Sequence, residues 1–130
     1  MVKRFGLGKS ERLKSRKQIE DLFATGSNLN IFPIRVLYKF FPADDETVLQ
    51  IGVSPSQKKF KRAVDRNRIK RLLREAYRLQ KNDLLDVLRK KKLRGNVFFI
   101  YSDNKLSTFW EIYDAMGKCL KQLQQKALET

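Results

Sequence analysis

The chain has 130 residues, the size of one compact domain, and 29 Lys and Arg against 14 Asp and Glu give it a formal net charge of +15. Such a surplus opposes compaction by self-repulsion and is typical of a protein with an anionic partner. There is no His and only one Cys, which excludes intramolecular disulfides, Cys/His zinc sites and His-based catalysis. No apolar run reaches the roughly 18 residues of a membrane-spanning helix, and no stretch reads as a signal peptide. We therefore expect a cytoplasmic protein without a membrane partner.

The N-terminal region predicts an arm followed by a short helix. Residues 1–9 are basic and lack periodicity, so we expect a flexible arm ahead of a single domain that spans 1–130. Ser15 can cap a helix, and Gly26 can end it. The apolar residues between them follow helical spacing: Ile19, Leu22 and Phe23.

Two strands are predicted next. Residues 34–41 alternate apolar and polar side chains, and residues 47–54 repeat the pattern. Residues 42–46 read as a short turn, so we expect the two strands to form a hairpin. The adjacent acids of that turn suit a solvated turn better than a metal site, because neighbours in sequence seldom converge on one cation. These acids are Asp44, Asp45 and Glu46.

The second half of the sequence predicts helices on either side of one central strand. Helical periodicity runs through Leu79, and a second short helix with Leu84, Leu85 and Leu88 follows Asn82. A basic cluster at 89–94 precedes an apolar strand at 97–101. Thr108 and Glu111 form a capping box for a last helix that extends to about Gln125, with Cys119 on its apolar face. The order of elements predicts an α+β domain.

The most basic segment of the chain is also a helix with two distinct faces. At about 100° per residue, Ile69, Leu72, Leu73, Ala76 and Leu79 share one side, and cations gather on the other. A solvated helix face usually interleaves both signs of charge, whereas here only Glu75 is available to pair with the cations. Arginine binds phosphate oxygens through its planar fork. We therefore expect this face to bind a polyanion, through Asn67, Lys70, Arg71, Arg74 and Arg78, with Arg66 and Arg68 on its flanks.

The aromatic residues favour single-stranded nucleic acid only slightly. Rings on predicted strands can stack on unpaired bases, but most of the nine Phe and four Tyr are needed for the core. Tyr38 is the ring that we expect to serve as a base platform.

The basic helix and its surroundings resemble one family. The run Ala63-Val64-Asp65-Arg66-Asn67-Arg68-Ile69-Lys70-Arg71-Leu72-Leu73-Arg74-Glu75-Ala76-Tyr77-Arg78 is similar to the R-N-R signature of the protein subunit of bacterial ribonuclease P. The similarity also covers Leu13 to Phe23, Gly26, Val36-Leu37-Tyr38, Ile51-Gly52-Val53-Ser54 and Val97 to Tyr101. The resemblance implies an α-β sandwich with a mostly antiparallel central sheet, three or more helices and a left-handed β-α-β crossover, as in a domain of a small-subunit ribosomal protein.

The resemblance also implies a function. The family's protein has no catalytic residues of its own: it binds a catalytic RNA, which with Mg²⁺ removes the 5′ leader from precursor tRNA. It implies no metal site on the protein, no organic cofactor and no obligate protein partner. The leader would lie in a cleft lined by Phe23 and Tyr38. The residues implied in RNA binding are Lys58, Lys59, Arg62, Arg66, Asn67, Arg68, Lys70, Arg71 and Arg74.

Other functions remain open from the residues alone. A ribosomal or assembly protein would show the same basic helix without any role in processing. A helix-turn-helix DNA-binding module needs two helices where this sequence predicts strands. A self-sufficient nuclease needs separated carboxylates around a metal, and the sequence offers no convincing set of them.

Overall fold

The computed structural model describes residues 11–43, 49–56 and 60–130, which form four helices and four strands. The predicted arm at 1–9, the acids of the predicted turn at 44–46, and Lys58 and Lys59 lie outside these ranges. The elements in chain order are α1 (Arg16–Thr25), β1 (Ser27–Ile31), β2 (Ile34–Pro42), β3 (Leu49–Pro55), α2 (Ala63–Gln80), α3 (Asn82–Lys91), β4 (Leu93–Tyr101) and α4 (Phe109–Leu128).

The strands form one mixed sheet in the order β1-β2-β4-β3, with β3 parallel to β4 and the other pairs antiparallel. The predicted hairpin of the strands now labelled β2 and β3 is therefore wrong, because β4 lies between them. A short connection does not oblige its strands to pair when a more apolar strand is available for the centre of the sheet. The sequence does not indicate β1, since its residues Ser-Asn-Leu-Asn-Ile include few apolar ones.

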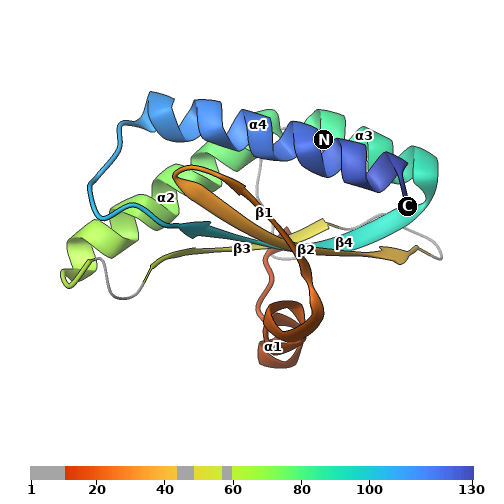
Figure 1. Cartoon of the computed structure of the whole chain (residues 1–130), viewed down its shortest axis with the longest axis horizontal. Coiled ribbons are helices and arrows are strands. Elements are labelled where there is room, and N and C mark those ends of the chain that lie inside the picture. The colour runs from red at the N-terminus through yellow and green to blue at the C-terminus, as the bar shows by residue number, and fades with distance from the viewer. Residues whose placement is uncertain (1–10, 44–48, 57–59) are drawn as a thin grey trace, which may run out of the picture.

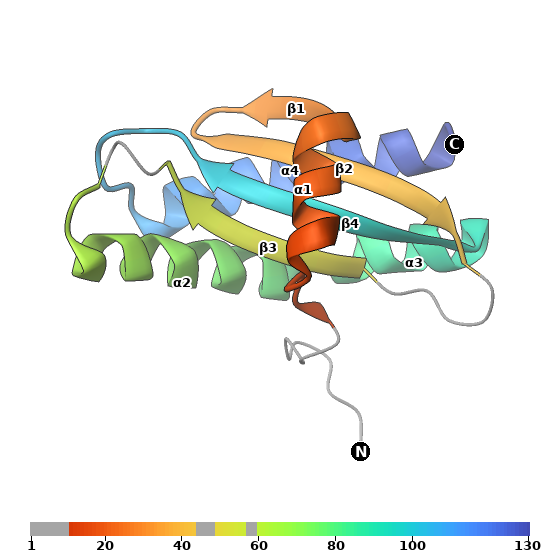
Figure 2. The same ribbon diagram turned by 90° about the horizontal axis from the view of Figure 1, so that it is seen from below.

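The sheet is covered on both faces. Figure 1 shows α2, α3 and α4 packed on one face and α1 alone on the other. If Figure 2 is turned so that β3 and β4 point upward, β4 lies to the right of β3 and the connection through α2 and α3 passes behind the sheet. This is the left-handed sense, contrary to the general preference. The α+β sandwich and its crossover agree with the expected fold.

Local signals set the helix ends. The Ser15 hydroxyl accepts a hydrogen bond from the Gln18 N–H at 3.3 Å, and the Gly26 N–H closes α1 on the Leu22 carbonyl oxygen at 2.9 Å. A capping box opens α4: the Thr108 hydroxyl accepts from the Glu111 N–H, and the Glu111 carboxylate accepts from the Thr108 N–H. These caps confirm the predicted ones, because a cap depends on residues that are close together in the chain.

The main core lies between the sheet and the three-helix layer, and a smaller one lies under α1. In α2 the buried positions are Ile69, Leu73, Ala76 and Tyr77. Leu79, which the periodicity assigns to this face, is 39% exposed, and Tyr77 takes the core position instead. Cys119 is fully buried, as predicted, and burial raises the pKa of its thiol to about 12.

Candidate nucleic-acid interface

The polar face of α2 presents the cations that the helical periodicity assigns to it. Asn67, Arg68 and Arg71 are exposed, while Lys70 and Arg74 are partly covered. The structure therefore gathers most of the predicted RNA-binding residues on one accessible helix.

A groove of about 380 Å³ lies along this face. It contains a guanidinium that the sequence pattern does not predict, because Arg12 comes from the segment ahead of α1. Leu13 donates its N–H to the Ile51 carbonyl oxygen at 2.8 Å, so this segment runs beside the edge strand β3 and reaches α2. Nothing in the local pattern around Arg12 signals that approach. The residues lining the groove are Arg12, Asn67, Lys70, Arg71, Arg74, Glu75 and Arg78.

The electrostatics of the groove favour an anionic ligand. Burial lowers the pKa of Arg74, and the charge of Arg12 lowers it further. Glu75 is the acid of the groove, and it forms an ion pair with Arg78. A phosphate placed among these cations would therefore relieve repulsion that the free protein bears.

Two other residues predicted to bind RNA lie where the chain enters α2. The Arg66 guanidinium donates to the carbonyl oxygens of Phe60 at 3.0 Å and Lys61 at 2.6 Å. Arg62 lies 3.9 Å from the Asp65 carboxylate and is largely exposed. Arg66 thus has a structural role that its place in the motif does not reveal.

A second and larger pocket, of about 760 Å³, lies between α1 and the sheet. Figure 2 shows α1 crossing this face of the strands. Phe23 of α1 is 52% exposed and meets Phe98 of β4 edge-to-face, with ring centroids 5.3 Å apart. The pocket is lined by Lys17, Gln18, Asp21, Phe41, Gln50, Arg94, Gly95 and Asn96.

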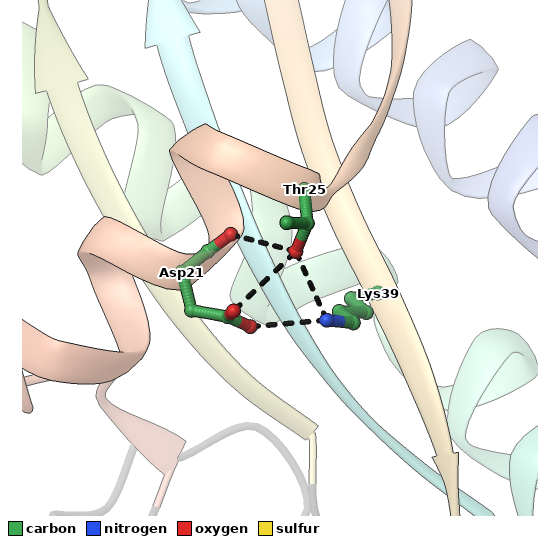
Figure 3. A network of polar contacts seen from close by, with 3 residues as sticks. All are labelled: Asp21, Thr25 and Lys39. Atoms are coloured by element: carbon green, nitrogen blue, oxygen red, sulfur yellow. Dashed lines mark hydrogen bonds and ion pairs between the residues drawn. The ribbon is translucent and has the colours of Figure 1, made fainter.

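A polar network joins α1 to β2 beside this pocket (Figure 3). The Lys39 ammonium donates to the Asp21 carboxylate at 3.1 Å and to the Thr25 hydroxyl at 3.0 Å. The Thr25 hydroxyl in turn donates to the Asp21 carbonyl oxygen at 3.0 Å. Because the apolar cluster under α1 is small, this network helps to fix the distance between helix and sheet.

Phe23 and Tyr38 do not line one cleft, contrary to the expected geometry. Tyr38 is 8% exposed and belongs to the main core, whereas the neighbouring Leu37 packs under α1. Both faces of β2 are covered, so alternation of apolar residues cannot show which face Tyr38 occupies. On the α1 side of β2 the ring that reaches the pocket is Phe41.

The part of the chain that the structure describes contains neither a cluster of metal-ligating side chains nor a membrane-spanning helix. No three Asp, Glu or Cys side chains there gather closely enough to hold a metal ion. Within the same residues, none of the helices combines the length and apolar character needed to cross a bilayer.

Comparison with known proteins gives one consistent result. The family model described as Ribonuclease P matches residues 7–124. The ribonuclease P protein component of Porphyromonas gingivalis is 40% identical over 116 residues, which cover 89% of this chain and 85% of that protein. The corresponding protein of Nitrosococcus oceani is 36% identical over 77 residues, covering 59% of this chain and 62% of that protein.

Solved structures show the same fold. The ribonuclease P protein of Staphylococcus aureus has a TM-score of 0.64 at 22% identity, covering 88% of this chain and 95% of that one. The protein from Thermotoga maritima has a TM-score of 0.62 at 23% identity, covering 86% and 96%. Because the family model matches residues 7–124 and one relative is 40% identical over 89% of this chain, the chain belongs to the ribonuclease P protein family.

Proposed function

We propose that this chain is the RNA-binding subunit of ribonuclease P and supports removal of the 5′ leader from precursor tRNA by a catalytic RNA. The observation that carries the proposal is the groove between Arg12 and α2, where cations from two segments face one another. A groove of this kind binds the backbone of a folded RNA, because each phosphate can sit between two or more positive side chains.

The pocket under α1 suits the leader. An unpaired strand presents its bases, and this pocket combines an aromatic ring, amides and cations. Precursor tRNA has a leader and mature tRNA has none. A protein that holds the leader therefore binds substrate more tightly than product, and affinity for the precursor rises without new chemistry in the protein.

In this proposal the two sites bind different RNAs. The α2 groove would anchor the protein on the catalytic RNA, and the pocket under α1, on the other face of the sheet, would face the leader. In this proposal the RNA holds most of the Mg²⁺, and hydrolysis takes place there. The protein contributes by screening the repulsion between two RNAs and by positioning the leader.

Reconstitution tests the proposal. The full chain is combined with ribonuclease P RNA at low Mg²⁺, and cleavage of precursor tRNA is measured with and without protein. We expect the protein to stimulate cleavage and to strengthen binding of precursor over mature tRNA. Tight RNA binding without stimulation would point instead to a ribosomal or assembly protein, and cleavage by the protein alone would point to a nuclease.

A further inference from the structure

The C-terminal end of α3 carries exposed cations that have no role in the function proposed above. The four residues, which we call the α3 end, are Arg89, Lys90, Lys91 and Lys92. The Arg89 guanidinium lies 3.0 Å from the carboxylate of Asp86. The three lysines form no ion pair with any residue that the structure describes. Most of the positive charge at the α3 end is therefore available to a partner.

Lys92 has a backbone conformation that does not favour a lysine. Its φ of 53° and ψ of 52° are left-handed, at the position after a helix where Gly is the usual residue. Its N–H donates to the Arg89 carbonyl oxygen at 3.1 Å, and its own carbonyl oxygen accepts from the Ala43 N–H at 2.9 Å. Gly at this position would keep both backbone bonds. The fold thus gains nothing visible from the Lys92 side chain, and a strained residue on the surface points to a function.

Stabilisation of the helix explains only part of this charge. Cations in the last turn interact favourably with the free carbonyl groups there, but one or two are enough for that effect. Successive helical residues are about 100° apart, so the cations of the last turn point in different directions. A small anion would meet only one or two of them. A nucleic acid, whose phosphates follow an extended backbone, can contact several at once.

The α3 end is well separated from the α2 groove but belongs to the same layer of helices. Figure 2 shows α2 and α3 following one another along the β3 side of the sheet, with α3 extending toward the start of β4. About 20 residues separate Arg71 from Lys91, and at a rise of 1.5 Å per helical residue they span about 30 Å at most. The pocket under α1 lies on the opposite face of the sheet. The RNA that lies against the helical layer is therefore the one that the α2 groove binds.

We propose that the α3 end is a second contact with the catalytic RNA, made to the phosphates of a region distant from the one in the α2 groove. This inference rests on the proposed function and adds a separate binding surface to it. One contact leaves the protein free to pivot on the RNA, whereas two fix its orientation and hold the pocket under α1 toward the leader. The second contact forms within an existing complex, so even weak binding there multiplies the affinity of the first.

Affinity for the catalytic RNA alone, without precursor tRNA, tests this contact. Replacing the three lysines of the α3 end by Ala should weaken binding of the full chain by at least about tenfold at moderate salt, and lower the slope of log affinity against log salt by about 2. A control variant loses three exposed lysines from other parts of the chain and should keep the wild-type slope: Lys105, Lys118 and Lys121. Wild-type affinity of the first variant, or equal losses in both, would overturn the inference.

Urea titration of the free protein separates a binding role from a folding role. Asp44, Asp45 and Glu46 follow Ala43 in the sequence and lie outside the described residues, so pairing with these acids is the competing role for the lysines. Lys92→Gly removes the left-handed strain, and we expect the urea midpoint to rise while affinity for the catalytic RNA falls several-fold. A lower midpoint with unchanged RNA affinity would assign Lys92 to the fold and overturn its proposed role.

Tethered cleavage identifies which RNA lies beside the α3 end. Cys119 is buried, so a thiol introduced by Asp86→Cys, at an exposed position of α3, is the accessible one and can carry an iron–EDTA group. We expect this probe to cut the catalytic RNA of the holoenzyme at discrete nucleotides that a probe at Gln122→Cys, exposed on α4, does not cut. Cuts confined to the leader of bound precursor tRNA, or no specific cuts in the catalytic RNA, would overturn the inference.

Failure of the proposed function gives a different result. If the wild-type protein does not stimulate cleavage of precursor tRNA by ribonuclease P RNA, the proposed function is wrong. If it does stimulate cleavage and the variant without the three lysines binds the catalytic RNA as tightly as the wild type, only the contact at the α3 end is wrong.

Discussion

The Lys81 ammonium lies 2.7 Å from the carboxylate of Glu11, 70 positions away in the chain. The Lys81 side chain is 4% exposed, and that of Glu11 is 29% exposed. Lys81 stands where α2 ends and α3 begins, so the pair ties the segment ahead of α1 to the helical layer. It holds the neighbouring Arg12 against α2.

Breaking this pair should weaken both stability and RNA binding. Glu11→Ala takes the carboxylate away from a buried ammonium, and we expect the free energy of unfolding to fall by roughly 3 kcal/mol. Urea titration measures that loss. Affinity for ribonuclease P RNA should fall as well, since Arg12 is no longer held in the groove. Glu129→Ala, which removes an exposed carboxylate near the end of the chain, should change neither quantity appreciably.

The α2 groove should control the salt dependence of RNA binding. Replacing Lys70 and Arg71 by Ala removes two groove cations and should lower the slope of log affinity against log salt by about 0.7–0.9 for each phosphate that is no longer neutralised. A matched pair of cations, Lys118 and Lys121, is exposed on α4. Their replacement changes net charge equally and should leave the slope nearly intact. Equal effects of the two double variants would mean that the salt dependence of RNA binding is set by net charge alone and not by the α2 groove.

Arg66 should differ from other cations of the motif. Its guanidinium donates to two loop carbonyls, so Arg66→Ala should lower the free energy of unfolding by about 1–3 kcal/mol. Arg71→Ala, at an exposed position of the same helix, should change it by no more than about 0.5 kcal/mol. Chemical denaturation of the free protein distinguishes the two. If Arg66→Ala proved as stable as the wild type, these two hydrogen bonds would contribute nothing measurable to the free energy of unfolding.

The network between α1 and β2 should matter for the leader more than for stability. Lys39→Met removes the bonds to Asp21 and Thr25, which are partly exposed and worth about 1 kcal/mol at most. With α1 less firmly placed, we expect the ratio of precursor to mature tRNA affinity to fall several-fold, while mature tRNA binds as before. Ratios of the dissociation constants for the two RNAs provide the measurement, and an unchanged ratio would show that the network does not shape the pocket.

Cys119 should make the protein less stable in alkali. Burial raises the pKa of its thiol from 9.0 to about 12, so between these values the folded state keeps a proton that the unfolded state loses. The folding stability due to this group is complete below about pH 9 and declines as pH rises toward 12. Cys119→Ala should flatten that decline in unfolding measurements across this range. At about pH 8 the native thiol should react with a disulfide reagent only as fast as the protein opens.

Local features and the family follow from the amino-acid sequence alone. The caps at Ser15 and Thr108 and the two faces of α2 depend on spacings of a few residues, which are visible in the printed chain. The R-N-R run indicates the family because its residues are contiguous. The strand partners are different: β2 and β3 are neighbours in sequence, yet β4 separates them in the sheet.

Which distant residues meet depends instead on how the elements pack. Arg12 joins the α2 groove because its segment runs along β3, and no local pattern encodes that approach. Tyr38 faces the main core, and Phe41 reaches the pocket under α1. The sequence cannot assign these sides, because both faces of the sheet are covered and apolar residues occur on each. Asn96 is an ordinary strand residue in the sequence, and only the tertiary structure places it on the wall of the pocket under α1. Short-range order is set by neighbouring residues, whereas a site forms only when the sheet and helices bring distant side chains together.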